Sequence, residues 1–370
     1  MTIKISKASL SEALNNVQSV VASKSTLQIL QNVKMSAKDG KVEFTCTDLD
    51  ITILARAECE VLDDGETTIP VKTFSSAVSK LAEGDIKIEV DQNDKAKLSS
   101  GQTVFKFIGL SAKDYPKLPD ETGDSITIAS PAVKELFRKT AFASSQDDTR
   151  KTLQGVLLDF SVDGGKVRSV ATDGRRLALL DADVGPKGKL NGQYIIPRKG
   201  VELLLRKLPK DGDCTIVTSG SQIRFKTARL DFCMKLLDET YPNYAQVIPS
   251  PSKEAFVAVV ADRVEVLGAI DRISVFTSAA EAPCMSMDFG DNKLVVSSNN
   301  TEFGEARDEV PVKFSGEKIS IKFNPQYIRE ALSAIDEDEI EFLLNSDRKP
   351  AIIKKGGMDD YTYVCMPLRI

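Results

Sequence analysis

Apolar positions recur along the chain three times with the same helical spacing. Residues 69–81, 196–208 and 323–335 form three segments, and the step from the first to the second equals the step from the second to the third. In each segment apolar residues fall at i, i+3, i+4 and i+7, which predicts the buried stripe of an amphipathic helix. The stripes are Phe74, Ala77, Val78 and Leu81; Val201, Leu204, Leu205 and Leu208; and Ile328, Ala331, Leu332 and Ile335. Four matched positions in three copies indicate a repeated unit.

Alternating apolar and polar positions also recur three times along the chain. Segments 40–50, 165–175 and 291–301 each predict a strand that runs into a polar turn. The turns carry Thr47-Asp48, Thr172-Asp173 and Asn299-Asn300 at equivalent places. Each unit also opens with a short strand and a further helix, at 2–5 and 10–21, at 126–128 and 133–142, and at 256–259 and 263–273.

Proline-rich turns at 114–119 and 241–249 mark the ends of the first two units. We therefore expect an α+β fold with three repeated domains, at residues 1–120, 121–250 and 251–370. Each domain should hold two helices packed on antiparallel sheets. The length of 370 residues suits two or three domains, and a hydrophobic fraction of 42% supplies ample core.

Composition narrows the function. The chain has neither histidine nor tryptophan. Without histidine it lacks the commonest general base and the ligand of most zinc sites. No dinucleotide-binding or P-loop glycine motif occurs, so neither a cofactor nor a metal is expected. Six cysteines without a CxxC pair indicate buried, reduced thiols, and the amino terminus has no apolar signal run, so we expect a cytosolic protein. A net charge of −5 argues at first sight against nucleic acid.

Four motifs carry a resemblance to a known family. They are ATDGRRLAL at 171–179, IPRKGV at 196–201, YPNYAQVIP at 241–249 and MPLRI at 366–370. Together with the triplicated pattern they resemble the beta subunit of bacterial DNA polymerase III, the sliding clamp, over the whole chain. The resemblance implies a non-enzymatic processivity factor that encircles duplex DNA without sequence specificity. It also implies as partners the replicative polymerase, a clamp loader and other clamp-binding peptides of repair and replication proteins.

The resemblance further implies a head-to-tail homodimer whose six domains close into a ring lined by twelve helices. Neighbouring helices pack about 8–10 Å apart, so twelve give a circle of about 34 Å diameter between axes. Subtracting one helix diameter of about 10 Å leaves about 25 Å, which is enough for a duplex. Basic residues on the polar faces of the repeated helices would then face the DNA and acidic residues would lie outside, which resolves the negative net charge.

The expected DNA contacts are sequence-independent phosphate contacts. The helix at 198–208 contributes three of them through its polar face, and the resemblance adds four more. The set is Lys24, Lys72, Arg150, Lys151, Arg198, Lys199 and Arg206. One family member carries aromatic residues at the positions of Lys151 and Thr152, so the chain departs from that member there.

The resemblance also places a peptide groove between the second and third domains. Partners would insert a short extended peptide with a leading Gln and following Leu and Phe anchors. The groove set is Leu153, Thr172, Gly174, Arg175, Arg176, Leu177, Pro242, Val247, Tyr327, Pro350, Val364, Met366, Pro367, Leu368 and Arg369. Arg175 stands where one family member has a histidine, and Ala245-Gln246 stand where two arginines are common in the family.

At the dimer interface the first domain should meet the third domain of the partner. The expected apolar residues are Phe105 and Phe107, which share one face of a strand, against Val275 and Phe276. The expected charges are Lys72, Lys97 and Lys106 near Glu302, Glu305, Asp308 and Glu309. One of the two phenylalanines is expected to belong to the domain's own core, and the pattern leaves open which one.

Two other classes of function compete with the clamp. An enzyme could use the carboxylates of Asp48, Asp173 and the acidic run 336–341. The recurrence of the Thr-Asp turns favours structural Asx turns, and the acidic run is typical of a helix-to-strand loop. The second alternative is a triplicated protein-interaction scaffold without DNA encirclement, which would form no ring dimer.

Overall fold

The computed structural model describes residues 1–370 except 22–26, 119–121, 148, 163–164, 186, 189, 251–254, 278–282, 301–303, 357–359 and 370. Contacts between residues divide the chain into two compact units. The first unit holds Met1–Lys134, Gly185–Asn191 and Lys199–Leu236, and the second holds Glu135–Val184, Gly192–Arg198 and Leu237–Ile370. Each unit is described by itself.

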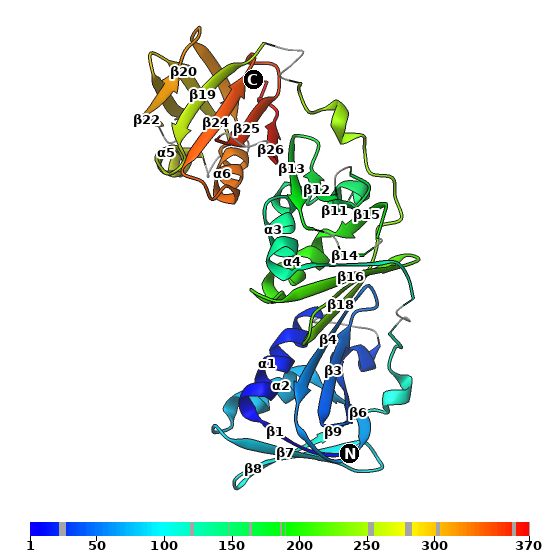
Figure 1. Ribbon diagram of the computed structural model, residues 1–370. Helices are drawn as coiled ribbons and strands as arrows, with labels where there is room; N and C mark the ends of the chain where they lie inside the picture. Colours follow the sequence, from blue (N-terminus) through cyan, green and yellow to red (C-terminus); the bar gives the residue numbers. More distant parts are fainter. Residues whose placement is uncertain are drawn as a thin grey trace. The chain divides into compact units, whose positions relative to one another are not determined.

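The first unit contains two antiparallel sheets, with strand orders β5-β1-β7-β8-β9 and β14-β10-β16-β17-β18-β4-β3-β2-β6. Helices α1 (Lys7–Val17) and α2 (Val71–Lys80) pack against each other (Figure 1). The strands are β1 (Thr2–Ser6), β2 (Asn32–Lys38), β3 (Lys41–Thr47), β4 (Ile51–Glu58), β5 (Glu60–Asp63), β6 (Gly65–Pro70), β7 (Asp85–Val90), β8 (Lys95–Ser100), β9 (Thr103–Ile108), β10 (Ser125–Ala129), β14 (Lys187–Gly188), β16 (Asp213–Ser219), β17 (Gln222–Lys226) and β18 (Leu230–Lys235).

The second unit is built on one sheet with the order β15-β11-β12-β13-β26-β25-β24-β19-β22-β21-β20-β23. Helices α5 (Arg263–Thr277) and α6 (Pro325–Ala334) pack together beside it. The strands are β11 (Gly155–Asp159), β12 (Lys166–Thr172), β13 (Arg176–Asp183), β15 (Gln193–Pro197), β19 (Val257–Asp262), β20 (Met285–Gly290), β21 (Lys293–Asn300), β22 (Gly304–Phe314), β23 (Ile319–Phe323), β24 (Glu339–Leu344), β25 (Ala351–Lys355) and β26 (Tyr361–Cys365). Helices α3 (Ser130–Arg138) and α4 (Arg198–Lys207) each have residues in both units.

The strand orders contain one topology three times. One sheet of each copy reads β5-β1-β7-β8-β9, then β14-β10-β16-β17-β18, then β22-β19-β24-β25-β26. The other sheet reads β6-β2-β3-β4, then β15-β11-β12-β13, then β23-β20-β21-β22. Consecutive copies are joined edge to edge, because β18 pairs with β4 and β26 pairs with β13. The expected fold class of three repeated α+β units with two helices each is confirmed.

The apolar stripes explain why the repeated helices form where they do. The side chains of Phe74, Val201 and Ile328 are all completely buried, as the period predicts. The stripe expected in α4 needs one correction. Leu203 is buried with 2% exposure, while Leu205 lies only half-buried. Helical spacing gives the direction of a face, and the neighbours packed against it decide how wide the buried part is.

Local signals also set the helix ends. The Ser6 hydroxyl accepts a hydrogen bond from the amide of Ser9 at the start of α1. At the start of α6 the Asn324 side chain accepts from Gln326 N, and Pro325 occupies the first turn, where its missing N–H costs nothing.

The sequence led us to expect buried, reduced cysteines. All six cysteines have free thiols; four are buried, whereas Cys59 and Cys284 are partly exposed, which corrects the expectation that all six are buried. None of the helices in the described part of the chain has the length and apolar character that crossing a bilayer requires.

Candidate functional site

The turn from Thr172 to Arg176 joins β12 to β13 and carries the centre of the predicted groove. Asp173 Oδ1 accepts from the amides of Arg175 at 2.9 Å and Arg176 at 3.0 Å. The Thr172 hydroxyl donates to the carbonyl oxygen of Arg176 at 2.6 Å and accepts from Gly174 N at 3.1 Å. Gly174 has φ +84, a left-handed conformation that glycine adopts without strain.

The equivalent turn of the first copy, Thr47 to Ile51, makes the same bonds. Asp48 Oδ1 accepts from Asp50 N at 3.1 Å and from Ile51 N at 2.8 Å, and Thr47 donates to the Ile51 carbonyl oxygen. The prediction that the repeated Thr-Asp pairs form Asx turns is therefore confirmed. The acidic run 336–341 begins in the loop after α6, and its last residues already belong to β24, as expected for a helix-to-strand connection.

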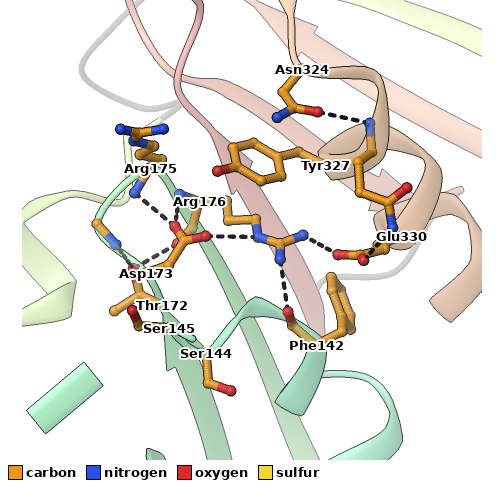
Figure 2. Close-up of polar contacts among 12 residues, drawn as sticks. Phe142, Ser144, Ser145, Thr172, Asp173, Arg175, Arg176, Asn324, Tyr327 and Glu330 are labelled. Atoms are coloured by element: carbon orange, nitrogen blue, oxygen red, sulfur yellow. Dashed lines mark hydrogen bonds and ion pairs between the residues drawn. The ribbon is translucent and has the colours of Figure 1, made fainter. Parts of the chain in front are cut away.

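Below this turn the guanidinium of Arg176 joins three elements (Figure 2). Its Nε donates to Asp173 Oδ2 at 3.1 Å, its Nη2 donates to the carbonyl oxygen of Phe142 at 2.8 Å, and its Nη1 is hydrogen-bonded to Glu330 of α6. The guanidinium carbon lies 4.4 Å from the centroid of the Tyr327 ring, within cation–π range. Only 8% of the Arg176 surface is exposed.

The charge of Arg176 is stabilised inside the protein. Burial lowers the pKa of Arg176, but neighbouring Tyr363, Glu330 and Asp173 more than compensate, so the pKa lies above its ordinary value. Glu330 is held in turn, because its other oxygen accepts from Gln326 Nε2 at 2.5 Å.

An apolar cluster lies beside this network. Leu177 and Val364, which are opposite each other in β13 and β26, are buried in it. The other buried members are Leu157, Val170, Leu179, Ile195 and Tyr241, with Leu237, Tyr244 and Ile248 packed against them. The carboxyl-terminal segment continues from β26, and Met366 N donates to the carbonyl oxygen of Arg175 at 2.9 Å. This segment is therefore tied to the turn.

The members of the groove set all lie in the second unit. Apolar exposure is concentrated at Val247, with 54% of its surface exposed, and at Met366, with 37%. Gly174, Arg175, Pro242 and Arg369 are exposed. Leu153, Tyr327, Pro350 and Leu368 are half-buried, while Thr172, Arg176, Leu177, Val364 and Pro367 are buried.

Asp173, Phe142 and Glu330 are part of this site but absent from the groove set. A sequence signal existed only for Asp173, through its repeated turn. Phe142 and Glu330 reach Arg176 across separations of 34 and 154 residues, and no local pattern encodes such contacts.

The residues expected to contact DNA differ in how freely they can do so. Lys72, Lys151 and Arg206 are exposed. Arg150 is exposed but donates from Nη1 to the carbonyl oxygen of Asp173 at 3.1 Å. Lys24 lies outside the described residues.

The two cations at the start of α4 already have partners. Arg198 donates to the carbonyl oxygen of Ser144 at 3.1 Å and is half-buried. Lys199 is 63% exposed and pairs with Asp48 of the equivalent turn, so this contact also joins the first and second copies.

One cation of the segment expected to be helical at 133–142 lies just beyond the end of α3 and does not face outward as the basic helix faces were expected to. Lys139 is buried with 2% exposure, and its ammonium contacts Glu135 at 2.9 Å and Asp336 at 3.5 Å. Arg138 pairs with Asp336 as well. Burial opposes the charge of Asp336, but Arg138 and Lys139 outweigh it and lower the pKa of this carboxyl. Arg138, Lys139, Glu135 and Asp336 thus form a structural ion cluster, and Lys139 is not available to bind phosphate.

Phe105 and Phe107 on β9 have different environments. Phe107 is 8% exposed and packs edge-on against Phe74 of α2, with ring centroids 5.4 Å apart, so it belongs to the chain's own core. Phe105 is only half-buried, and the outward-facing Val104 and Ile108 are 47% and 79% exposed. The strand β9 is the last strand of its sheet.

The other residues expected at the interface lie on α5 and β22. Val275 is 72% exposed, Phe276 is half-buried and Glu305 is exposed. Glu302 lies outside the described residues. Asp308 is already paired with Arg272 at 2.6 Å, and Glu309 with Lys293 and Arg307.

Several solved sliding clamps share this fold over the whole chain. The DNA polymerase III beta subunit of Pseudomonas aeruginosa superposes with a TM-score of 0.92 at 31% identity, covering 100% of both chains. The sliding clamp of Bacillus subtilis gives a TM-score of 0.94 at 28% identity, covering 100% of this chain and 99% of the other. A Pseudomonas aeruginosa clamp bound to griselimycin gives 0.94 at 31% identity, with full coverage of both.

Sequence comparisons agree domain by domain. Profiles of the N-terminal, central and C-terminal domains of the DNA polymerase III beta subunit match residues 1–119, 127–243 and 245–369. The beta sliding clamp of Pseudomonas aeruginosa is 31% identical over 374 residues and that of Chlamydia muridarum 28% over 371, each covering 100% of this chain and at least 99% of the relative. The chain therefore belongs to the family of DNA polymerase III beta subunits, the bacterial beta sliding clamps.

Proposed function

We propose that two copies of this chain join head to tail into a closed ring around duplex DNA in the cytoplasm. The ring serves as the processivity factor of the replicative polymerase, holding the polymerase on its template without any catalytic residue of its own. The observation that carries this proposal is the topology of the sheets. The three copies of the repeated domain are joined by two equivalent strand pairs, each between the edge strands of neighbouring copies. An edge strand equivalent to those in the pairs remains at the outer end of the first copy and at the outer end of the third.

These terminal edges are β9 in the first copy and residues 304–308 of β22 in the third; together we call them the seam. Within the chain, Met234 of β18 lies opposite Ile51 of β4, and Cys365 of β26 lies opposite Arg176 of β13. In each copy the strand that follows the turn lies in the same register against the strand before it, with Thr52 opposite Thr47, Leu177 opposite Thr172 and Glu305 opposite Asn299. Ile51, Arg176 and Gly304, each one residue earlier, are therefore equivalent. In the repeat, residues 304–308 therefore correspond to the strands that already pair in β4 and β13.

The same repeat gives a register for the seam. The step between the helix segments of the first two copies makes Phe107 equivalent to Met234, so Phe107 should lie opposite Gly304 of the partner subunit. One residue on, in antiparallel register, Lys106 lies opposite Glu305 of the partner subunit. Both of these side chains are exposed in the single chain, and cross-strand pairs of opposite charge stabilise a sheet.

Aromatic packing supports this register. The chain has two junctions between copies, the first where β18 pairs with β4 and the second where β26 pairs with β13. At the second junction Phe142 stacks on Tyr363 of β26, with ring centroids 5.9 Å apart. Phe105 corresponds at the seam to Tyr363. Tyr363 lies two residues before Cys365, which is opposite Arg176, and Phe105 lies two residues before Phe107, which should be opposite Gly304 of the partner subunit. Val133 of α3 and Val266 of α5 are the first fully buried apolar residues of their helices. Val275 stands nine positions after Val266, as Phe142 in the turn beyond α3 stands nine positions after Val133. The half-buried Phe105 and the exposed Val275 thus lack the contact that a second copy would supply.

We assign the DNA contacts to the cations on the repeated helices and nearby turns. Lys72 and Lys199 occupy equivalent positions at the starts of α2 and α4, where α6 has Gln326. The exposed Lys72, Lys151 and Arg206 are the best placed to bind phosphate, with Lys24, Arg150, Arg198 and Lys199 contributing as the local ion pairs exchange. Weak phosphate contacts of this kind carry no sequence information and let the ring slide.

We assign partner binding to the groove set. Val247 and Met366 offer exposed apolar surface, Leu177 and Val364 belong to the buried cluster, and methionine adapts to varied ligands. Arg175 and Arg369 add positive charge at the rim. Partners that share the groove would include the polymerase, the clamp loader that opens the ring, and peptides of repair proteins. A solved Pseudomonas aeruginosa clamp with this fold is bound to griselimycin, so at least one relative takes a ligand.

Retention on DNA of different topology tests encirclement. The chain is loaded with a clamp loader and ATP onto nicked circular DNA and onto the same DNA made linear. A closed ring stays on the circle and slides off the free ends of the linear form. Equal retention on both would refute encirclement and favour a scaffold or an ordinary DNA-binding protein. Sedimentation should give a particle of twice 40.4 kDa.

A further inference from the structure

Arg176 lies beneath the proposed groove with its polar atoms directed into the protein. Asp173, Glu330 and the Phe142 carbonyl each accept a hydrogen bond from a different nitrogen of its guanidinium, and the ring of Tyr327 stacks on it (Figure 2). With 8% of its surface exposed, the residue has little area left for a ligand. Its neighbour Arg175 is exposed instead.

The first in-chain junction provides an internal comparison. At the position of Arg176 the first copy has Ile51, and at the position of Glu330, one repeat earlier along the chain, α4 has Leu203. These residues are 3% and 2% exposed. The same fold therefore forms this junction with apolar side chains. Buried ion pairs are often no more stabilising than apolar residues of similar volume, so folding alone does not require the Arg176 network.

The ion network adds directional hydrogen bonds, which apolar contacts do not provide. Apolar contacts tolerate sliding, whereas hydrogen bonds from one planar guanidinium fix the angle and distance between their partners. Here they fix the turn Thr172–Arg176 against Glu330 of α6. The same turn holds the carboxyl-terminal segment through the bond from Met366 N to the Arg175 carbonyl, and Leu177 follows it in the apolar cluster.

We propose that Arg176, held by Glu330 and Asp173, is a positioning residue that keeps the two walls of the groove at a fixed spacing and makes no direct contact with the partner peptide. One wall is the turn Thr172–Arg176 with Leu177, and the other is α6 with the carboxyl-terminal segment. This inference rests on the proposed function of the groove. It makes the second junction the one that needs directional bonds, because that junction must accept a ligand.

Transplanting the apolar pair of the first junction tests the proposal. The double variant Arg176→Ile, Glu330→Leu is compared with the wild-type chain for binding of a fluorescein-labelled Gln-Leu-Ser-Leu-Phe peptide by fluorescence anisotropy. Thermal unfolding and sedimentation are measured on the same samples. We expect an unchanged or higher melting temperature and an intact dimer, with peptide binding weakened roughly tenfold or more because a site loosened by even ~1 Å loses fit.

Single variants provide the rescue and the control. Glu330→Gln keeps an acceptor for the Arg176 guanidinium, so its affinity should stay within about threefold of wild type, while Glu330→Leu should lose roughly tenfold. The control Arg329→Gln breaks an ion pair of the same kind on the adjacent residue of α6, where Arg329 Nε contacts Asp271 at 2.7 Å. It should leave peptide affinity unchanged.

Each outcome decides one question. A wild-type chain that fails to bind the peptide overturns the proposed groove itself. If wild type binds and the folded double variant binds equally well, the groove stands and the positioning role of Arg176 is wrong. Should the double variant fail to fold, the folded Glu330→Gln and Glu330→Leu variants decide, and equal affinities in these two would overturn the inference.

Discussion

Replacing Phe105 and Phe107 separately by alanine should give opposite phenotypes from the same strand. Phe107 is 8% exposed and packs on Phe74 within one chain. Its loss should leave a cavity and lower the free energy of unfolding by about 3–5 kcal/mol. Phe105 is half-buried in the single chain and is completed, in our proposal, by the partner. Its loss should scarcely change the unfolding of the subunit and should weaken the dimer.

The size of the dimer effect follows from burial and symmetry. Fully burying a phenylalanine stabilises by about 1.5–3 kcal/mol, and Phe105 is already partly covered, so about 1–1.5 kcal/mol is expected per seam. A ring of two copies has two seams, which gives about 2–3 kcal/mol. The dimer dissociation constant should therefore rise roughly 30- to 150-fold.

Two assays separate the effects. Sedimentation equilibrium measures the dimer dissociation constant, and denaturant unfolding at concentrations where subunits are separate measures the stability of one chain. An unchanged dissociation constant for Phe105→Ala would refute the seam register, as would a loss of subunit stability equal to that of Phe107→Ala. A charge exchange adds a check on register: Lys106→Glu alone should weaken the dimer, and adding Glu305→Lys should restore much of the loss.

Four further outcomes are expected. Deleting Met366–Ile370 should abolish peptide binding and polymerase stimulation while sedimentation still shows a dimer; loss of the dimer would reassign that segment. Leu49 has φ +80 where the equivalent turn has a glycine, so Leu49→Gly should raise the free energy of unfolding by about 1 kcal/mol in denaturant titrations. Although burial opposes it, the pKa of Asp336 is lowered in the folded chain by Arg138 and Lys139, so its contribution to stability is present above about pH 4 and is lost as the pH falls below that value. Asp336→Asn should accordingly flatten the acid limb of a plot of melting temperature against pH, and an unaltered limb would show that this pair is irrelevant. Arg206→Glu should shorten retention on nicked circular DNA and reduce the salt dependence of DNA binding, with dimerisation unaffected.

Periodicity and local turn chemistry carried most of the fold. The three helices near 74, 201 and 328 and the Asx turns at Asp48 and Asp173 depend on neighbours within a few residues, so the sequence alone predicts them. The repeat itself is also readable, because equal spacing of equivalent residues requires no knowledge of what packs against them.

Tertiary structure decided what lies opposite each predicted face. Phe105 and Phe107 share a strand and a face, yet only the position of Phe74 identifies Phe107 as core. Lys139 follows the pattern of an exposed helical lysine, but Asp336, which lies in a different copy of the repeat, takes it into a buried ion cluster. The sequence likewise places Arg176 on the surface of the groove, whereas in the structure its guanidinium is hydrogen-bonded to Glu330. A sequence period specifies the direction of a side chain, whereas its burial and charge partner come from segments that are brought together only when the chain folds.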